Sequence, residues 1–186
     1  HFTDSGGELA RGVAKRFHIS GCHYALSEML RNEQLDIIHI CTPPRTHVAL
    51  SIQAMEAGCH VIVEKPMALS VKEADEMIQA SKDYGVKLSV GHNLLFHPLV
   101  PKARLLIAKG NIGELTGVDI EFSLSRYTGG IVKRDHWCHK LPGGVFCNKL
   151  PPPTSLAMAF LGHLEVVAVH TRKLSSCDWM DADELR

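Results

Sequence analysis

The chain has 186 residues and carries 20 Lys and Arg residues against 20 Asp and Glu residues, so its formal net charge is zero. That balance gives no basis for binding nucleic acid or an anionic membrane surface. Hydrophobic residues make up 45% and charged residues 22%, as in globular domains, and no stretch approaches the roughly 18 apolar residues of a membrane span. The first residues do not resemble a signal peptide, so we expect a cytoplasmic protein of one domain or two small ones.

Strands and helices alternate through the first half of the chain. Apolar residues at helical spacing predict helices, and short β-branched runs predict buried strands. Gly58 and Gly85 follow two of the helices, where a left-handed residue is common, and Ser70 forms a capping box with Glu73. The alternation predicts parallel βαβ units with right-handed crossovers. The predicted helices are 8–17, 27–32, 46–57 and 70–84, and the predicted strands are 37–41, 60–63 and 86–90.

The pattern changes in the second half. A helix over 98–109 is followed by two longer segments with alternating polarity, 115–125 and 163–171, which predict strands. Between them lie a loop rich in Gly and Pro and a short helix over 155–161. We therefore predict an α/β chain: a partial Rossmann-type parallel sheet in residues 1–97, then a partial α+β domain with a mainly antiparallel sheet in residues 98–186.

The six cysteines are scattered, which favours free thiols in a reducing cytosol over a disulfide framework. They are Cys22, Cys41, Cys59, Cys138, Cys147 and Cys177, and Cys41 falls inside a predicted buried strand. His136, Cys138 and His139 are close enough in sequence to suggest a metal. No second pair with ligand spacing completes that group, so we predict no metal site.

Polar residues follow three of the predicted strands. Thr42 and His47 follow the first, Glu64 and Lys65 the second, and His92 and Asn93 the third. The carboxyl ends of parallel strands meet at one edge of a sheet, where α/β proteins bind ligands. Proline after Lys65 ends its strand, and a cis bond between Lys65 and Pro66 would point the lysine into that crevice. The alternative is a set of solvated strand ends.

The three motifs TPPxxH (42–47), EKP (64–66) and GHN (91–93), in this order, resemble the glucose-fructose oxidoreductase, inositol dehydrogenase and MocA family of nicotinamide-dependent oxidoreductases. The resemblance covers essentially the whole chain. It implies hydride transfer between a nicotinamide cofactor and a secondary alcohol of a sugar, a polyol or a related small molecule. It also implies that the first strand and its GxGxxG turn would lie before residue 1, because no GxGxxG occurs in the chain. On this view the chain is a fragment truncated at both ends.

The resemblance implies roles for the first two strand ends. Thr42 and Pro43 would lie along the cofactor's pyrophosphate and nicotinamide ribose, and His47 would lie on the cofactor side or simply cap a helix start. Glu64 would contact the nicotinamide ribose. Lys65 would be the catalytic residue, reaching the oxygen on the reacting carbon, where a fixed cation stabilises developing alkoxide. The alternative for Glu64 and Lys65 is a surface salt bridge.

Three further residues complete the predicted cofactor site. Asp4 follows the presumed second strand, where an acid would accept hydrogen bonds from the adenosine ribose and favour NAD over NADP. Its alternative role is the N-cap of the next helix. His92 and Asn93 would line the same crevice. The predicted cofactor is NAD, with NADP as the alternative.

The chain departs from the family where a catalytic base is expected. Family members carry Asp, His and Asp at positions that align here with Asn148, Pro152 and Ser155. No ionisable group stands at these positions, and the run 151–153 of three prolines argues against a regular helix there. Substitutes for the base would be His92, His136 and His139. The alternative is a non-catalytic family member, or a ligand-binding or scaffold unit that forms homo-oligomers through the second sheet.

Overall fold

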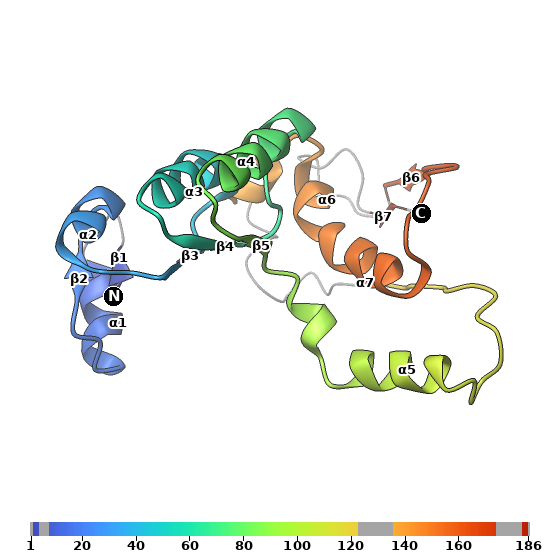
Figure 1. Ribbon diagram of the computed structural model, residues 1–186. Helices are drawn as coiled ribbons and strands as arrows, with labels where there is room; N and C mark the ends of the chain where they lie inside the picture. The colour runs from blue at the N-terminus through green and yellow to red at the C-terminus, as the bar shows by residue number, and fades with distance from the viewer. Residues whose placement is uncertain (1, 4–7, 123–135, 174–183, 186) are drawn as a thin grey trace. The chain divides into compact units, whose positions relative to one another are not determined.

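The computed structural model describes residues 2–3, 8–122, 136–173 and 184–185, and these form two compact units (Figure 1). The first unit is His1–Gly91 and the second is His92–Arg186. No helix in the described part of the chain is both long enough and apolar enough to cross a bilayer.

The first unit contains two parallel sheets and their helices. One sheet pairs β1 with β2, and the other has the strand order β3-β4-β5, with both pairs parallel. The elements are β1 (Phe2–Thr3), α1 (Glu8–Arg16), β2 (Cys22–His23), α2 (Leu26–Asn32), β3 (Ile37–Ile40), the 3-10 turn η1 (Pro44–Thr46), α3 (His47–Glu56), β4 (His60–Val63), α4 (Val71–Asp83) and β5 (Leu88–Val90). The predicted parallel α/β architecture is confirmed.

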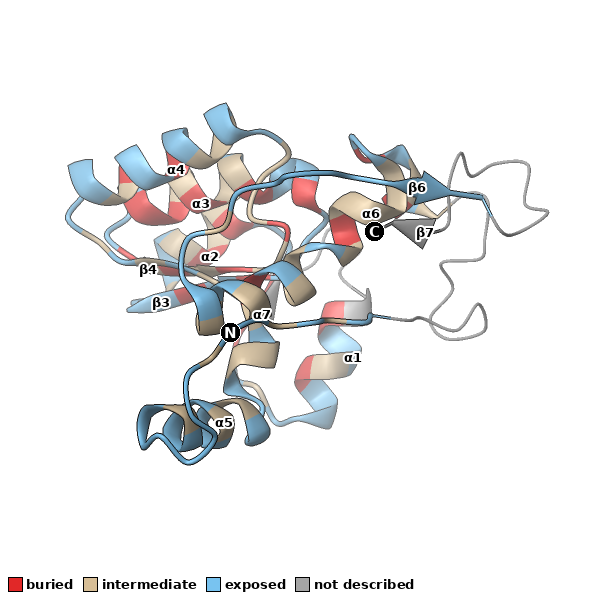
Figure 2. Ribbon diagram, turned by 90° about the vertical axis from the view of Figure 1, so that its right-hand side faces the viewer, coloured by how far each residue is buried: buried red, intermediate tan, exposed pale blue. Residues whose placement is uncertain are grey.

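One face of the sheet β3-β4-β5 is packed against α3 and α4, as the buried sides of both helices in Figure 2 indicate. Alternate strand residues, Ile38 and Ile40 on β3 and Val61 and Val63 on β4, are at most 6% exposed. The intervening residues are more exposed. The sequence predicted buried strands; among the described residues one face of the sheet is covered, because both α3 and α4 lie on that side.

The ends of α4 and α3 follow the predicted capping chemistry. The hydroxyl of Ser70 accepts a hydrogen bond from the Glu73 N–H at 3.2 Å. The carboxylate of Glu73 accepts one from the Leu69 N–H at 2.7 Å, so both partners of the predicted box are engaged. Gly58 and Gly85 have φ of +82° and +65°, the left-handed conformation expected after a helix.

The described residues of the second unit are mainly helical among their regular elements. Its elements are the 3-10 turn η2 (Asn93–Phe96), α5 (Leu99–Ala108), the 3-10 turn η3 (Trp137–Lys140), α6 (Gly144–Lys149), α7 (Pro151–Leu161), β6 (Thr171–Arg172) and β7 (Glu184–Leu185). β6 and β7 form an antiparallel ladder of two residues each. This short ladder does not establish the mainly antiparallel sheet that the sequence predicted.

Three predictions for this unit were wrong in the described residues. Residues 115–122 and 163–170 are not strands, because no described segment pairs with them and a lone strand leaves its N–H and C=O groups without ladder partners. Val166 and Val167 are accordingly 81% and 97% exposed. The run of three prolines does not prevent a helix: α7 begins at Pro151, since the first-turn N–H groups of a helix have no intrahelical partner to lose.

Candidate active site

The carboxyl ends of β3, β4 and β5 are held in register beyond the strands themselves. Ile40 lies opposite Val63, and Val63 lies opposite Val90. The Glu64 N–H then donates to the Ile40 carbonyl at 2.9 Å, and the Gly91 N–H donates to the Val63 carbonyl at 2.8 Å. These two bonds fix the backbone of Glu64 at the sheet edge, between the chain segments that leave β3 and β5.

Gly91 makes room for the Glu64 carboxylate. A Cβ atom at residue 91 would lie 3.2 Å from Oε1 of Glu64 and 3.4 Å from its Cδ. A side chain at residue 91 would therefore require the carboxylate to shift by a few tenths of an ångström. The space beside the Glu64 carboxylate thus gives a steric reason for glycine at the first position of the GHN motif, which the sequence analysis did not identify.

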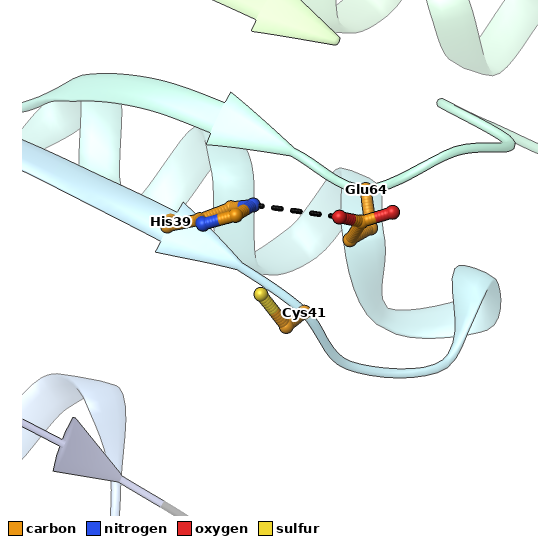
Figure 3. Close-up of side chains that lie close together, drawn as sticks. All are labelled: His39, Cys41 and Glu64. Atoms are coloured by element: carbon orange, nitrogen blue, oxygen red, sulfur yellow. Dashed lines mark ion pairs between the residues drawn. The ribbon is translucent and has the colours of Figure 1, made fainter. Parts of the chain in front are cut away.

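His39, Cys41 and Glu64 form a cluster at this edge (Figure 3). His39 and Cys41 are two residues apart, so they point to the same side of β3 and its extension, and Glu64 follows the neighbouring strand. Nε2 of His39 lies 3.7 Å from Oε1 of Glu64. Desolvation of the thiol by the surrounding protein and, secondarily, the Glu64 carboxylate raise the pKa of Cys41. Sequence analysis placed Cys41 inside a buried strand; β3 ends at Ile40, and Cys41 is exposed.

The loop after β3 is ordered by its two threonines. The Thr46 hydroxyl donates to the Pro43 carbonyl at 2.8 Å, and its oxygen lies 2.6 Å from the hydroxyl of Thr42. Since the single hydroxyl proton of Thr46 is directed at Pro43, the Thr42 hydroxyl donates to Thr46. Thr42 and Pro43 are exposed, so both predicted cofactor residues are accessible to a ligand.

His47 is the first residue of α3, and its side chain is fully buried. Nε2 lies 2.8 Å from the Thr42 carbonyl oxygen. Nδ1 lies 3.0 Å from the carbonyl oxygen of Pro66 and 3.3 Å from that of Met67. Carbonyl oxygens only accept, so the ring nitrogen that carries the proton donates to the carbonyl it faces, and a neutral imidazole, with one N–H, donates to only one of the two loops. This placement disfavours both earlier interpretations, a direct cofactor contact and a helix cap: the imidazole lies between the loop after β3 and the loop after β4.

Lys65 and Pro66 leave β4 through a cis peptide bond, as predicted. Lys65 is partly exposed, whereas Pro66 is buried. Because the carbonyl of Pro66 is held by His47, the backbone on the carboxyl side of Lys65 is fixed to α3. Glu64 and Lys65 are therefore both presented from backbone that has hydrogen bonds on either side.

The remaining predicted residues lie elsewhere or outside the described residues. Asp4 falls outside them. His92 and Asn93 directly follow Gly91 but belong to the second unit. Asn148 and Ser155 are 7% and 8% exposed, and the Ser155 hydroxyl donates to the Pro152 carbonyl within α7 at 2.9 Å.

Two other features of the second unit contain no predicted cofactor residue. A shallow hollow between α5 and α7 is lined by Arg104, Ile107, Ala108, Ala159 and Phe160. His136 and Cys138 approach each other, with Nδ1 2.9 Å from Sγ, but Cys138 is fully buried.

The fold and the strand-end motifs define a nucleotide-binding α/β protein, and comparison with known proteins agrees. Residues 1–92 match the model of the GFO_IDH_MocA oxidoreductase family with an NAD-binding Rossmann fold. The chain belongs to this family, and the family's cofactor, NAD, is the one that the sequence predicted.

Individual relatives support the same assignment. Oxidoreductase P35 of Formosa agariphila is 28% identical over 141 residues, which are 74% of this chain and 44% of the relative. A solved structure from Bordetella bronchiseptica RB50, described provisionally as a dehydrogenase, has a TM-score of 0.81 and 28% identity over 94% of this chain and 45% of its own. A levoglucosan dehydrogenase solved with NADH and levoglucosan has a TM-score of 0.56 and 32% identity over 60% of this chain and 30% of its own. The chain thus spans less than half the length of these proteins.

Proposed function

We propose that this chain provides the nicotinamide-side part of an NAD-dependent oxidoreductase that acts on a secondary alcohol of a sugar or polyol. The observation that carries the proposal is the segment 64–66. It brings a carboxylate and an ammonium group to the carboxyl edge of the parallel sheet on backbone held at both ends. That edge is where ligands bind in open α/β sheets.

The residues at this edge fit the cofactor of the family. Side-chain exposure of 39% leaves the Glu64 carboxylate open to hydroxyl groups of a ligand, and a carboxylate accepts the hydrogen bonds that ribose hydroxyls donate. Gly91 leaves the space that this carboxylate occupies. Thr42 and Pro43 offer an exposed, hydrogen-bonded turn beside it. When bound, the nicotinamide would supply or accept the hydride.

Lys65 is proposed as the catalytic residue. An ammonium group beside the reacting carbon's oxygen favours the alkoxide form, which develops as the hydride leaves the carbon. We propose that His47 positions this lysine through the carbonyl of Pro66 and does not itself contact the ligand. His92, Asn93 and Asp4 remain proposed cofactor residues, and NADP remains the alternative cofactor.

A sugar or polyol substrate is supported by the likeness to levoglucosan dehydrogenase. The absence of an ionisable group at Asn148, Pro152 and Ser155 supports a second candidate, a member that binds ligand without turnover. Loss of general base help typically costs roughly 10²–10⁴-fold in rate. Self-association through the second unit and a cytoplasmic location stay predictions of the sequence.

Alcohol turnover and NADH binding, both measured on the protein that contains this chain, distinguish an active dehydrogenase from a member that binds ligand without turnover. NADH fluorescence gives the dissociation constant, and absorbance at the nicotinamide band follows reduction of NAD with levoglucosan, inositol and other polyols. Under the first candidate, Lys65→Met lowers kcat by at least about 100-fold and leaves the NADH affinity within about threefold, because a transition-state contact is lost. Lys72→Met, an exposed lysine of α4, is the matched control and changes neither quantity.

Binding of NADH without turnover of any alcohol would favour the non-catalytic candidate. Wild-type turnover by Lys65→Met would refute the catalytic assignment of Lys65. Glu64→Gln should weaken NADH binding by about tenfold, since one charge-assisted hydrogen bond to a hydroxyl is worth roughly 1.5 kcal/mol or more.

A further inference from the structure

The cluster of His39, Cys41 and Glu64 has the chemistry of a cation site. It offers an imidazole nitrogen, a sulfur and a carboxylate oxygen, and these three atoms all lie within 4.8 Å of one another. It is the one such group found in the part of the chain that the structure describes. Mixed nitrogen, sulfur and oxygen donors suit Zn²⁺ and similar transition metals better than Mg²⁺ or Ca²⁺.

The sheet places these donors before any metal arrives. His39 and Cys41 lie on the same side of one chain segment, two residues apart, and the register of β3 with β4 sets Glu64 beside Cys41. Their relative backbone positions are fixed by the ladder bonds already described. Figure 3 shows the three side chains close together at the ends of the two strands.

The distance between the imidazole and carboxylate donors is close to that of a tetrahedral site. Bonds of roughly 2.0–2.3 Å from zinc to its ligands place neighbouring ligand atoms about 3.5 Å apart. Nε2 of His39 and Oε1 of Glu64 are already 3.7 Å apart. The side chains of His39 and Glu64 are 50% and 39% exposed, so a hydrated cation can reach them, and water can complete the coordination.

We propose that His39, Cys41 and Glu64 bind one Zn²⁺ ion, or a transition-metal cation of the same preference, at the carboxyl edge of the sheet. The proposal does not rest on the proposed dehydrogenase function, because it concerns the metal and these three side chains alone. Where that function also holds, the ion would compete with the cofactor, since Glu64 cannot serve both at once. Sequence analysis predicted no metal site because it considered only the His136 region.

The test uses the 186-residue chain, freed of metal and kept reduced without a chelating thiol. Zn²⁺ affinity is measured by competition with a chromophoric chelator, and Co²⁺ is added as a spectroscopic probe. We expect one equivalent of either metal to bind and the Co²⁺ complex to show the near-ultraviolet absorption of a thiolate ligand. Cys41→Ser should abolish that absorption, and His39→Gln and Glu64→Gln should each weaken Zn²⁺ binding by at least about tenfold.

Two variants serve as matched controls. Cys147→Ser removes a partly buried thiol from α6. His60→Gln removes an imidazole from β4, and His60 lies two residues before Ile62 on that strand. Both should bind Zn²⁺ as the wild type does. Because His39 and Cys41 are exposed, their substitution should leave the unfolding transition of the metal-free chain unchanged; if Cys41→Ser does not fold, the affinity of His39→Gln decides.

The proposal is overturned if the wild-type chain binds no Zn²⁺ at micromolar concentration, or if the Co²⁺ complex lacks thiolate absorption. It is equally overturned if Cys41→Ser or His39→Gln binds Zn²⁺ with wild-type affinity. Loss of binding in Cys147→Ser together with retention in Cys41→Ser would place the metal elsewhere in the chain and overturn it too.

Discussion

His47 is a buried polar side chain that lies between two functional loops. Its ring nitrogens face the carbonyls of Thr42 and Pro66. Pro66 is the residue directly after Lys65. A buried carbonyl that loses its donor costs free energy, because water cannot replace the bond. The residue therefore links the stability of the first unit to the position of its candidate catalytic lysine.

We predict that His47→Leu lowers the free energy of unfolding by about 1–3 kcal/mol, because the carbonyl to which the buried ring donates loses its hydrogen bond. Urea unfolding, followed by circular dichroism in the presence of a metal chelator, measures the change. His39→Leu is the control at a half-exposed position and should change the free energy by no more than about 0.5 kcal/mol. Equal, small effects for both variants would contradict the linking role of His47.

At the scale of the element, the position of a residue within a helix decides what its side chain does. Ser70 and Glu73 at the start of α4 satisfy N–H groups that the helix itself cannot. The three prolines at the start of α7 are tolerated for the same reason, as they remove N–H groups that would have no intrahelical partner. Ser155, one turn further on, donates to the Pro152 carbonyl.

Ser70→Ala should destabilise the first unit by about 1 kcal/mol, the usual value of an N-cap side chain. Ser81→Ala is the matched control within α4, where the hydroxyl donates back to the Ile78 carbonyl. That change should be neutral or slightly stabilising, because alanine is the better helix former. Thermal and urea unfolding of both variants would test the difference, and a larger loss in Ser81→Ala would contradict the capping assignment.

At the scale of the whole molecule, several thiols have raised pKa values. Burial is the largest cause for each of Cys41, Cys59, Cys138 and Cys147. The neighbouring Asp36 raises the pKa of Cys59 further, and the thiol of Cys59 donates to the Leu35 carbonyl at 3.1 Å. A group whose pKa is higher in the folded state releases its proton more readily on unfolding.

We therefore expect the free energy of unfolding to be insensitive to these thiols below about pH 8.5, the usual pKa of an unfolded cysteine. Above that pH the unfolded thiols ionise first, so the stabilisation is lost as the pH rises towards and through the folded pKa values. Urea unfolding from pH 7 to pH 10 under reducing conditions measures this loss. In Cys59→Ala the free energy of unfolding should fall less between pH 7 and pH 10 than in the wild type. An equal fall in both proteins would show that Cys59 does not contribute.

Local patterns in the sequence were sufficient for the elements and motifs of the first unit. Three signals depend only on neighbours within one turn or one strand: β-branched runs, glycines that follow helices, and the capping box that begins at Ser70. For this reason β4, α3 and α4 were predicted close to their observed bounds. The EKP and GHN motifs also identified the strand ends. In the second unit the same reasoning failed at residues 163–170, because a strand needs a partner that local sequence does not specify.

Tertiary structure decided which side chains meet. The pairing of β3 with β4 puts His39 beside Glu64, residues 25 positions apart in the chain, and no local pattern contains that register. It likewise buried His47, which had been interpreted from its motif alone, by packing α3 over the loops that follow both strands. Sequence alone determined the strand ends and the polar residues on them; the hydrogen-bonded register between strands determined which of those residues form a site, because distances across a sheet depend on long-range pairing.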